Sequence, residues 1–240
     1  MSRINELCQQ FVAHSLRPRL YQQADRFPWH LYLRIVYNDA LTYDPATKKG
    51  GLKANFVFPK VARSAQNKNL QLLISELIYQ KQHEEINVMD KLSLSDYFVS
   101  AATLVVKEAE GPNVLKDLTF GRKDVASEAE AGDVSQIPAA GAGYKSALKA
   151  KGFDDAEIVS LAAIEAFGCV WDPKKRDVSR EPKLDNFYYK QLLSPSANVV
   201  LKSELTGDAE LKAIVEKFAQ DPKAFHESFA KAFLKLTSLG

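Results

Sequence analysis

Apolar residues recur along most of the chain at intervals of three and four, the spacing that lines up side chains on one face of an α-helix. Near the start, Ile4, Leu7 and Phe11 follow this spacing and predict an amphipathic helix that ends before Pro18. The same pattern predicts further helices over residues 29–41, 70–78, 93–108, 144–151, 154–168, 184–193, 208–219 and 222–238. No stretch alternates in the way that predicts a β-strand, so the expected fold class is all-α.

Two segments lack a helical period. Residues 52–64 are expected to form a loop. Residues 123–143 are rich in Ala, Gly, Glu and Ser, a composition typical of an irregular surface connection. Such a segment cannot fold alone, and we expect it to become ordered against a partner. We treat residues 1–240 as a single domain with two helical lobes, approximately 1–125 and 140–240, joined by residues 123–143.

Composition narrows the class of function. Hydrophobic residues make up 46% of the chain and charged residues 26%, as is ordinary for a globular domain. The net charge is +2, from 32 basic and 30 acidic residues, which argues against nucleic-acid binding because that usually needs a clustered basic surplus. No apolar run approaches the roughly 20 residues of a membrane-spanning helix. The residues up to Phe11 are too polar for a signal or transit peptide, so the chain is expected to be untargeted or in mature form.

The two cysteines, Cys8 and Cys169, are too few for a disulfide framework or a zinc site. Cys169 lies in an apolar stretch and is interpreted as a small buried hydrophobic residue. A single disulfide between the two cysteines remains an alternative. The cysteines therefore do not decide whether the protein lies in an oxidising or a reducing compartment.

One face of the helix predicted over 29–41 gathers side chains that could carry chemistry. Arg34, Tyr37 and Asn38 stand at i, i+3 and i+4 and therefore share that face. Residues 33–40 resemble the Leu-Arg-Leu-Ala-Trp-His-Ser-Ala motif of plant-type haem peroxidases, ascorbate peroxidase in particular. Residues 41–51 resemble the segment that follows it in that family, Thr-Tyr/Phe-Asp and then Thr-Lys-Thr-Gly-Gly. A plainer interpretation of the three side chains is inherited packing, with the arginine paired to a local acid and the tyrosine filling core.

The resemblance continues in order along the chain. Further matching segments cover residues 65–70, 95–106, 120–124, 137–138, 153–161, 184–193 and 230–240. Each segment is short, but together they span almost the whole chain. The resemblance implies an all-α haem-peroxidase fold of about ten helices, here with degenerate distal and proximal sites.

The distal site that the resemblance implies is altered. In the family a distal histidine moves the proton of the peroxide, which requires a group that titrates near working pH. Asn38 stands in its place and has no titratable proton, and Tyr37 takes the place of the distal tryptophan. Arg34, which in the family stabilises the departing oxygen, is retained. Asn67 matches the residue that orients the distal histidine, and we expect it to lack a partner.

The proximal site is altered as well. In the family a histidine binds the iron and is held by an aspartate. Glu165 takes the place of this histidine and Glu204 the place of the aspartate. The family's proximal tryptophan falls near Asp177, and Trp171 comes too early to replace it. The four histidines all fall away from the family's pocket; they are His14, His30, His83 and His226.

Two carboxylates could instead mark a metal site, since hard cations accept carboxylate oxygens. No further ligand stands at a fixed spacing from Glu165 and Glu204, so we expect no metal there. We also expect no haem, because a carboxylate is a poor ligand for haem iron. The resulting prediction is a peroxidase-like protein without a cofactor that is not a working enzyme.

The resemblance is greater still to a haem-free branch of the class I peroxidases, the thylakoid lumenal ascorbate-peroxidase-like proteins, which carry Asn-Asp-Ala-Met-Thr-Tyr-Asp where this chain has residues 38–44. It implies an accessory or assembly subunit of an organellar membrane complex, in the thylakoid lumen or at the thylakoid membrane periphery. A photosystem is the favoured partner, and a mitochondrial respiratory complex is second. Two alternatives stay open: a divergent haem-binding peroxidase acting on hydrogen peroxide, and a small-ligand binder using the vacated haem cavity.

Overall fold

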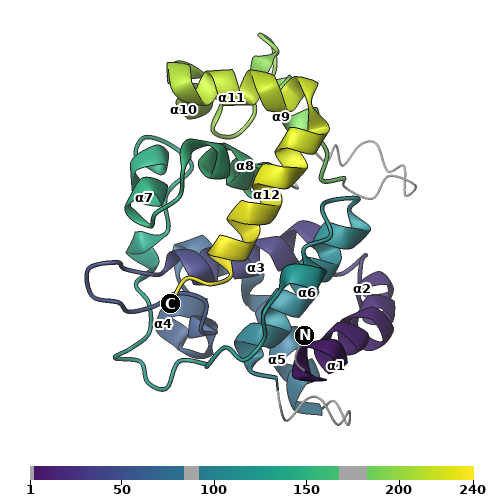
Figure 1. Cartoon of the computed structure of the whole chain (residues 1–240). Helices are drawn as coiled ribbons and strands as arrows, with labels where there is room; N and C mark the ends of the chain where they lie inside the picture. The colour runs from purple at the N-terminus through teal and green to yellow at the C-terminus, as the bar shows by residue number, and fades with distance from the viewer. Residues whose placement is uncertain (1–2, 84–91, 168–182) are drawn as a thin grey trace. The chain divides into compact units, whose positions relative to one another are not determined.

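The computed structural model describes residues 3–83, 92–167 and 183–240 (Figure 1). Within these residues the regular structure is helical, apart from one isolated antiparallel bridge between Asp44 and Lys49. The all-α prediction is therefore confirmed. The long helices are α3 (Trp29–Leu41), α5 (Gln71–His83), α6 (Leu94–Glu108), α8 (Asp155–Ala166), α11 (Ala209–Gln220) and α12 (Pro222–Leu236). Shorter helical elements are α1 (Arg3–Phe11), η1 (Val12–Leu16), α2 (Arg17–Gln22), η2 (Asn55–Val57), α4 (Pro59–Ala62), η3 (Ala65–Leu70), η5 (Leu115–Asp117), η6 (Val134–Gln136), α7 (Tyr144–Ala150), α9 (Phe187–Leu193) and α10 (Lys202–Gly207).

Three expectations about these elements are wrong. The first helix does not end before Pro18, because the backbone widens into the π-turn η1 and resumes as α2 with Pro18 in its first turn. Proline is tolerated in a first turn, where its missing N–H costs no bond. Residues 52–64 are not simply a loop, because they contain η2 and α4. The short helix α10 lies in a stretch where no helix was expected.

The chain divides into two compact units. Unit 1 comprises Met1–Val105, Val114–Ile137 and Leu236–Gly240, and unit 2 comprises Val106–Asn113 and Pro138–Lys235. The last residues of α6 therefore belong to unit 2, and the last residue of α12 belongs to unit 1.

In unit 1, α3 packs against α5, η3 and η6. A buried ion pair lies beside the start of α6: the Arg122 guanidinium is 2.8 Å from the Asp96 carboxylate, which is fully buried. Arg122 Nε also donates to the Thr237 carbonyl (2.8 Å), so this arginine ties the end of the chain to α6. Leu239 then accepts a backbone hydrogen bond from Leu52 N (2.8 Å).

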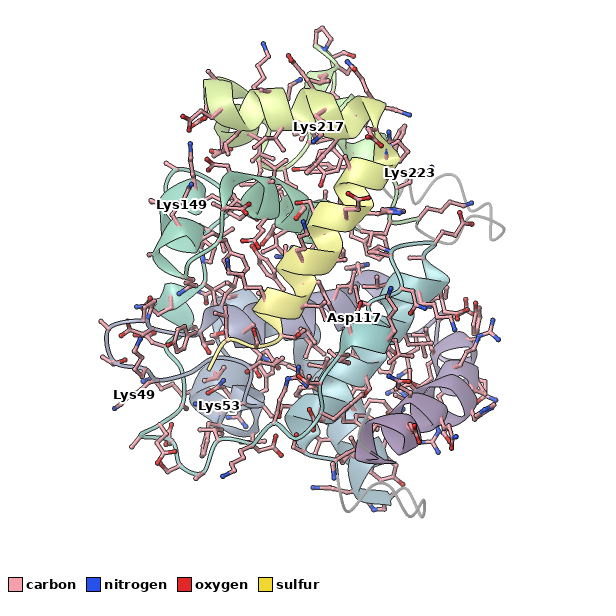
Figure 2. The ribbon with its side chains drawn as sticks, viewed as in Figure 1. Lys49, Lys53, Asp117, Lys149, Lys217 and Lys223 are labelled. Carbon is pink, nitrogen blue, oxygen red and sulfur yellow. The ribbon has the colours of Figure 1, made fainter. Side chains whose placement is uncertain are left out.

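In unit 2, α11 packs against α8, α9 and α10. The centre of this unit is a run of aromatic rings whose centroids lie 4.9–5.9 Å apart, formed by Tyr189, Phe218, Phe225, Phe229 and Phe233. The apolar stripe of the last helix is thus core, as its spacing predicts. The basic residues of unit 2 are spread over separate helices, with Lys149 on α7, Lys217 on α11 and Lys223 on α12 (Figure 2).

Residues 123–137, which we call the strap, form most of the segment 123–143 that was predicted to be an irregular connection. The strap is irregular apart from η6, as predicted, and it is hydrogen-bonded to other segments of unit 1; its ordering against a partner stays a prediction. Val125 N donates to the Lys53 carbonyl (2.7 Å), and Gly50 N donates to the Glu130 carbonyl (3.3 Å). The Asp124 carboxylate accepts from the first free N–H groups of α6, at Leu94 and Ser95. Figure 2 labels Lys49 and Lys53, which lie on the segment that bonds to the strap through Gly50 and Lys53.

Candidate functional site

The first group of candidate residues lies on α3. Tyr37 and Asn38 are buried, whereas Arg34 is half-buried. The Arg34 guanidinium carbon lies 5.8 Å from the centre of the Tyr37 ring, within the range of a cation–π contact. The structure thus brings Arg34 and Tyr37 together on α3, and it confirms that Tyr37 fills core.

Asn67 has a partner, contrary to expectation. Asn38 Nδ2 donates to Asn67 Oδ1 (2.8 Å) and to the Gln66 carbonyl (3.3 Å). Asn67 Nδ2 in turn donates to the Val61 carbonyl (2.9 Å), so a chain of amides connects α3 to residues 61–67. Our expectation considered only the missing imidazole, but an asparagine amide also offers an N–H in the direction of Asn67.

The chemistry available at Asn38 follows from this arrangement. Its Nδ2 is committed to two acceptors, and among the described residues its buried Oδ1 has no hydrogen-bond donor. A carboxamide neither gains nor loses a proton near neutral pH, so it cannot serve as a general base. The side chain can position a group by hydrogen bonding, but it cannot exchange protons with one.

The opposite side of α3 holds a buried polar cluster that the sequence analysis missed. Asp39 Oδ2 accepts from Ala54 N (2.7 Å), and Asp39 Oδ1 accepts from the backbone N and side-chain Nδ2 of Asn55 (both 2.9 Å). Asn55 Oδ1 accepts from Gly132 N in the strap (2.8 Å), and Thr42 Oγ1 donates to the Asp39 carbonyl (2.7 Å). One signal was available: Asp39 is the one acid of the mostly apolar helix α3, and a carboxylate that is buried there needs hydrogen-bond donors.

Ionisation at this cluster is shifted by burial. Burial raises the pKa of Asp39 from 3.8 to about 7, while hydrogen bonds from the Asn55 side chain and from backbone N–H groups act to lower it. Because Asp39 is fully buried and its donors come from the 54–55 segment, its charge state is coupled to how that segment packs on α3.

The four histidines are all described, and they lie on separate elements. His14 is exposed in η1, and His83 is the exposed last residue of α5. His30 is half-buried on α3, two turns before Asn38; burial first, and the Arg34 charge second, lower its pKa. His226 Nε2 lies 2.8 Å from the Leu184 carbonyl in unit 2.

The second group of candidate residues is centred on α8 in unit 2. This helix starts with a capping box, in which Asp154 Oδ1 accepts from Glu157 N (2.8 Å) and Glu157 Oε2 accepts from Asp154 N (2.9 Å). Lys235 Nζ donates to Glu157 Oε2 (2.8 Å), and Tyr189 Oη donates to the Val159 carbonyl (3.1 Å). Two residues from other helices, Lys235 and Tyr189, therefore bond to the first turns of α8.

Glu165 is the last residue but one of α8 and is 7% exposed. Its neighbours along the helix are apolar, including Ala162, Ile164 and Ala166. Glu204, in α10, is half-buried, and its Oε2 accepts from Ser203 Oγ (2.9 Å). In the described part of the chain, no three His, Cys, Asp or Glu residues are grouped so that they could hold a metal ion. The metal alternative for these two glutamates therefore has no third ligand there.

Some predicted residues cannot be placed. Asp177, Trp171 and Cys169 lie outside the described residues. Cys8 is buried as a free thiol, and burial, together with the nearby Asp96 charge, raises its pKa to about 11. This thiol is therefore poorly reactive at neutral pH. None of the helices within the described ranges is long and apolar enough to cross a membrane.

The side chains can be tested for fit to haem, which the resemblance implies. Haem iron in proteins is bound by histidine, cysteine, methionine or tyrosine. The sequence of α8, Asp-Ala-Glu-Ile-Val-Ser-Leu-Ala-Ala-Ile-Glu-Ala, offers none of these. On α3, Asn38 supplies no base for peroxide cleavage. Asn38 and the residues of α8 therefore do not fit a peroxidase haem site.

Comparison with known proteins agrees with the helical architecture. The model of the family described as peroxidase matches residues 12–221. A probable L-ascorbate peroxidase 3, peroxisomal, from Oryza sativa subsp. japonica is 28% identical over 219 residues, which cover 88% of this chain and 72% of the relative. The cytosolic L-ascorbate peroxidase 1 of the same rice is also 28% identical, over 88% of this chain and 85% of the relative. The chloroplastic L-ascorbate peroxidase T of Arabidopsis thaliana is 25% identical, over 90% of this chain and 57% of the relative. The chain thus belongs to the peroxidase family, within the class I plant-type branch of the ascorbate peroxidases, and has its all-α fold.

Proposed function

We propose that this protein is a peroxidase-family member that binds no haem, has no peroxidase activity and serves as an accessory subunit of a plastid membrane complex. The observation that supports the first part is that Glu165, which the family resemblance aligns with the axial histidine, is a buried carboxylate on α8. A single substitution there removes the iron ligand, and without iron the remaining distal residues have no bound oxygen to act on.

Asn38 supports the same conclusion from the other site. Its amide preserves the bond to Asn67 while lacking a titratable proton. Selection for peroxide cleavage would retain a base at this position, because general acid–base catalysis contributes roughly 10²–10⁴-fold to rate. A structural role requires only that the hydrogen bonds between α3 and residues 61–67 are kept. The combination of a retained frame and a lost base favours a protein used for its surface.

The proposal also places the protein in the plastid and assigns it to a membrane complex. Both assignments rest on the resemblance to the haem-free thylakoid branch, and a relative named as chloroplastic is compatible with them. The favoured assembly is a photosystem, reached by peripheral attachment.

Two measurements on protein isolated from its own membranes test the proposal. The membranes are solubilised in mild detergent and separated on a native gel, and the protein is located by immunoblot. It is expected to migrate with a photosystem, and the purified protein is expected to contain substoichiometric haem by the pyridine haemochrome assay. Migration only as a free monomer would contradict the accessory role. Stoichiometric haem with peroxide turnover above that of free hemin would contradict the proposal that the protein is non-catalytic.

A further inference from the structure

Unit 1 contains a small cavity that takes no part in the function proposed above. It lies among η1, α2, α3, α5 and α6, and every residue that lines it belongs to unit 1. Leucine and alanine side chains form the apolar part of its wall, and one of them is Leu16, the last residue of the π-turn η1. Such π-turns are frequent at functional sites. The cavity volume of about 10 Å³ is room for about one water-sized particle.

The polar part of the wall includes a hydroxyl without a partner. Tyr32 is 4% exposed, and among the described residues no group forms a hydrogen bond with its Oη. A buried hydroxyl in this state is costly, because it has given up its bonds to water and gained none. Burial first, and the Glu76 charge second, raise the pKa of Tyr32, so the hydroxyl keeps its proton at neutral pH. Because Tyr32 lines the cavity, a hydrogen-bond acceptor placed there would satisfy this donor.

The two amides in the wall, Gln23 and Gln80, also leave a donor over. Glu76 Oε1 accepts from Gln23 Nε2 and from Gln80 Nε2 (both 2.9 Å), and these bonds, first that from Gln80, lower the pKa of Glu76. Gln80 Nε2 also donates to Gln23 Oε1 (3.1 Å), and Gln80 Oε1 accepts from Tyr97 Oη (3.0 Å). An amide nitrogen carries two N–H groups, so Gln80 has used both and Gln23 has one left.

Charges of both signs lie near the cavity. Arg19 is part of the wall, and its guanidinium carries five N–H donors, so it can keep its other partners and still donate into the cavity. The Glu76 carboxylate opposes an anion, but its Oε2 lies 3.7 Å from Arg26 Nη1, which offsets part of its charge. The wall therefore offers hydrogens from a hydroxyl, an amide and a cation to a single small acceptor.

We infer that this cavity is a binding site for a chloride ion, held by the Tyr32 hydroxyl, the remaining amide N–H of Gln23 and the Arg19 guanidinium. The inference does not depend on the accessory role or on the loss of haem. Three donors in an otherwise apolar wall suit an acceptor that brings no hydrogen of its own, whereas a water molecule brings two. The volume is too small for a carboxylate or a phosphate. A bound chloride would connect α2 to α3 and stabilise the folded chain as the chloride concentration rises.

Thermal unfolding of the full chain in sodium chloride and in sodium gluconate, at equal ionic strength, tests the site because gluconate is too large for the cavity. With chloride at about ten times its Kd, the wild type should unfold about 3–6 °C higher than in gluconate. Tyr32→Phe should lose this difference, and Arg19→Met should reduce it. The matched control is Tyr79→Phe, which removes the hydroxyl of a 58% exposed tyrosine of α5 and should keep the full difference.

A further variant tests the electrostatics of the site. Glu76→Gln removes the negative charge beside the cavity, and its side-chain oxygen can still accept from Gln23 and Gln80. It should lower the Kd of chloride by about fivefold. A merely structural role of Glu76 predicts the same change of the unfolding midpoint in both salts. In crystals soaked in sodium bromide, an anomalous peak is expected beside Tyr32 Oη.

The other outcomes overturn the site. Equal unfolding midpoints of the wild type in the two salts would mean that no chloride binds. A chloride-dependent rise that survives in both Tyr32→Phe and Arg19→Met would place the ion elsewhere. A loss of stability in Tyr32→Phe that is the same in both salts, without a chloride effect in the wild type, would assign the cavity to a water molecule.

Discussion

The helices α3 and α8 carry the two side chains at which we propose that peroxidase chemistry was lost, but they are anchored differently. On α3 the anchors surround the altered position: Asn38 bonds to Asn67, and Asp39 bonds to residues 54 and 55. On α8 the hydrogen bonds and the ion pair that we identify gather near its start, at Asp154 and Glu157. Under the proposed function the two sites lose their chemistry in different ways. At Asn38 the frame is kept and only the proton chemistry is gone, whereas at Glu165 the ligand itself is replaced.

The largest expected effect concerns the frame of α3. Asp39→Ala removes the acceptor of three buried N–H donors, at Ala54 and Asn55, and should lower the free energy of unfolding by about 4 kcal/mol. The control is Asp44→Ala, because the bonds that the Asp44 carboxylate accepts from Ala46 and Thr47 lie in an exposed turn. It should cost about 1 kcal/mol. Equal losses in chemical denaturation would show that the buried cluster does not anchor α3.

The same carboxylate predicts a pH dependence. Its folded pKa of about 7 lies above the ordinary 3.8, so the folded state holds the proton more tightly than the unfolded state. The contribution to stability is fully present below about pH 4 and is lost as pH rises through 7, with a total of up to about 4 kcal/mol. We expect Asp39→Asn to remove this slope. The measurement is the difference in unfolding free energy between wild type and variant from pH 4 to pH 8, and a difference independent of pH would contradict it.

A smaller effect tests whether Asn38 is part of the frame. Asn38→Ala and Asn67→Ala should each cost about 2 kcal/mol, because each leaves a buried amide without its partner. The double variant should cost less than the sum, with a coupling of about 1 kcal/mol. Asn38→His should retain the bond through its ring N–H and stay within about 1 kcal/mol of wild type. Strict additivity in urea unfolding would mean that the two amides do not depend on each other.

The smallest effect concerns the start of α8. Lys235 pairs with Glu157 and lies over the Phe153 ring, 5.2 Å from its centre, but its side chain is 37% exposed. Lys235→Met should therefore cost only about 1 kcal/mol. Lys231→Met, on the exposed side of the same helix, is the control and should change the midpoint of thermal unfolding little. A cost for Lys235→Met as large as that for Asp39→Ala would remove the contrast between α3 and α8.

The periodic part of the fold could be predicted from the sequence. Helices such as α3 and α12 place one apolar face inward, and that face is visible as a repeat of three and four residues. The elements that were missed depend on longer-range contacts. The strap is held by hydrogen bonds from Val125 and Gly132 to residues more than seventy positions earlier in the chain. No local sequence pattern predicts these bonds.

The candidate site was predictable in its residue types and less so in its bonds. The spacing of Arg34, Tyr37 and Asn38 correctly placed them on one face, because helix geometry alone decides it. The Asn38–Asn67 bond was missed because it depends on where residues 61–67 fold back onto α3. The Asp39 cluster was missed for the same reason, since its donors come from a backbone segment with a left-handed residue at Ala54.

The central claim is that the replacement at residue 165, rather than that at residue 38, removes haem from this protein. Titration of hemin into the wild type, Asn38→His and Glu165→His, followed by absorbance in the Soret region, tests it most directly. We predict no stoichiometric Soret transition in the wild type or in Asn38→His, and a histidine-ligated spectrum with at least about tenfold tighter binding in Glu165→His. A one-to-one Soret transition in the wild type would contradict the account.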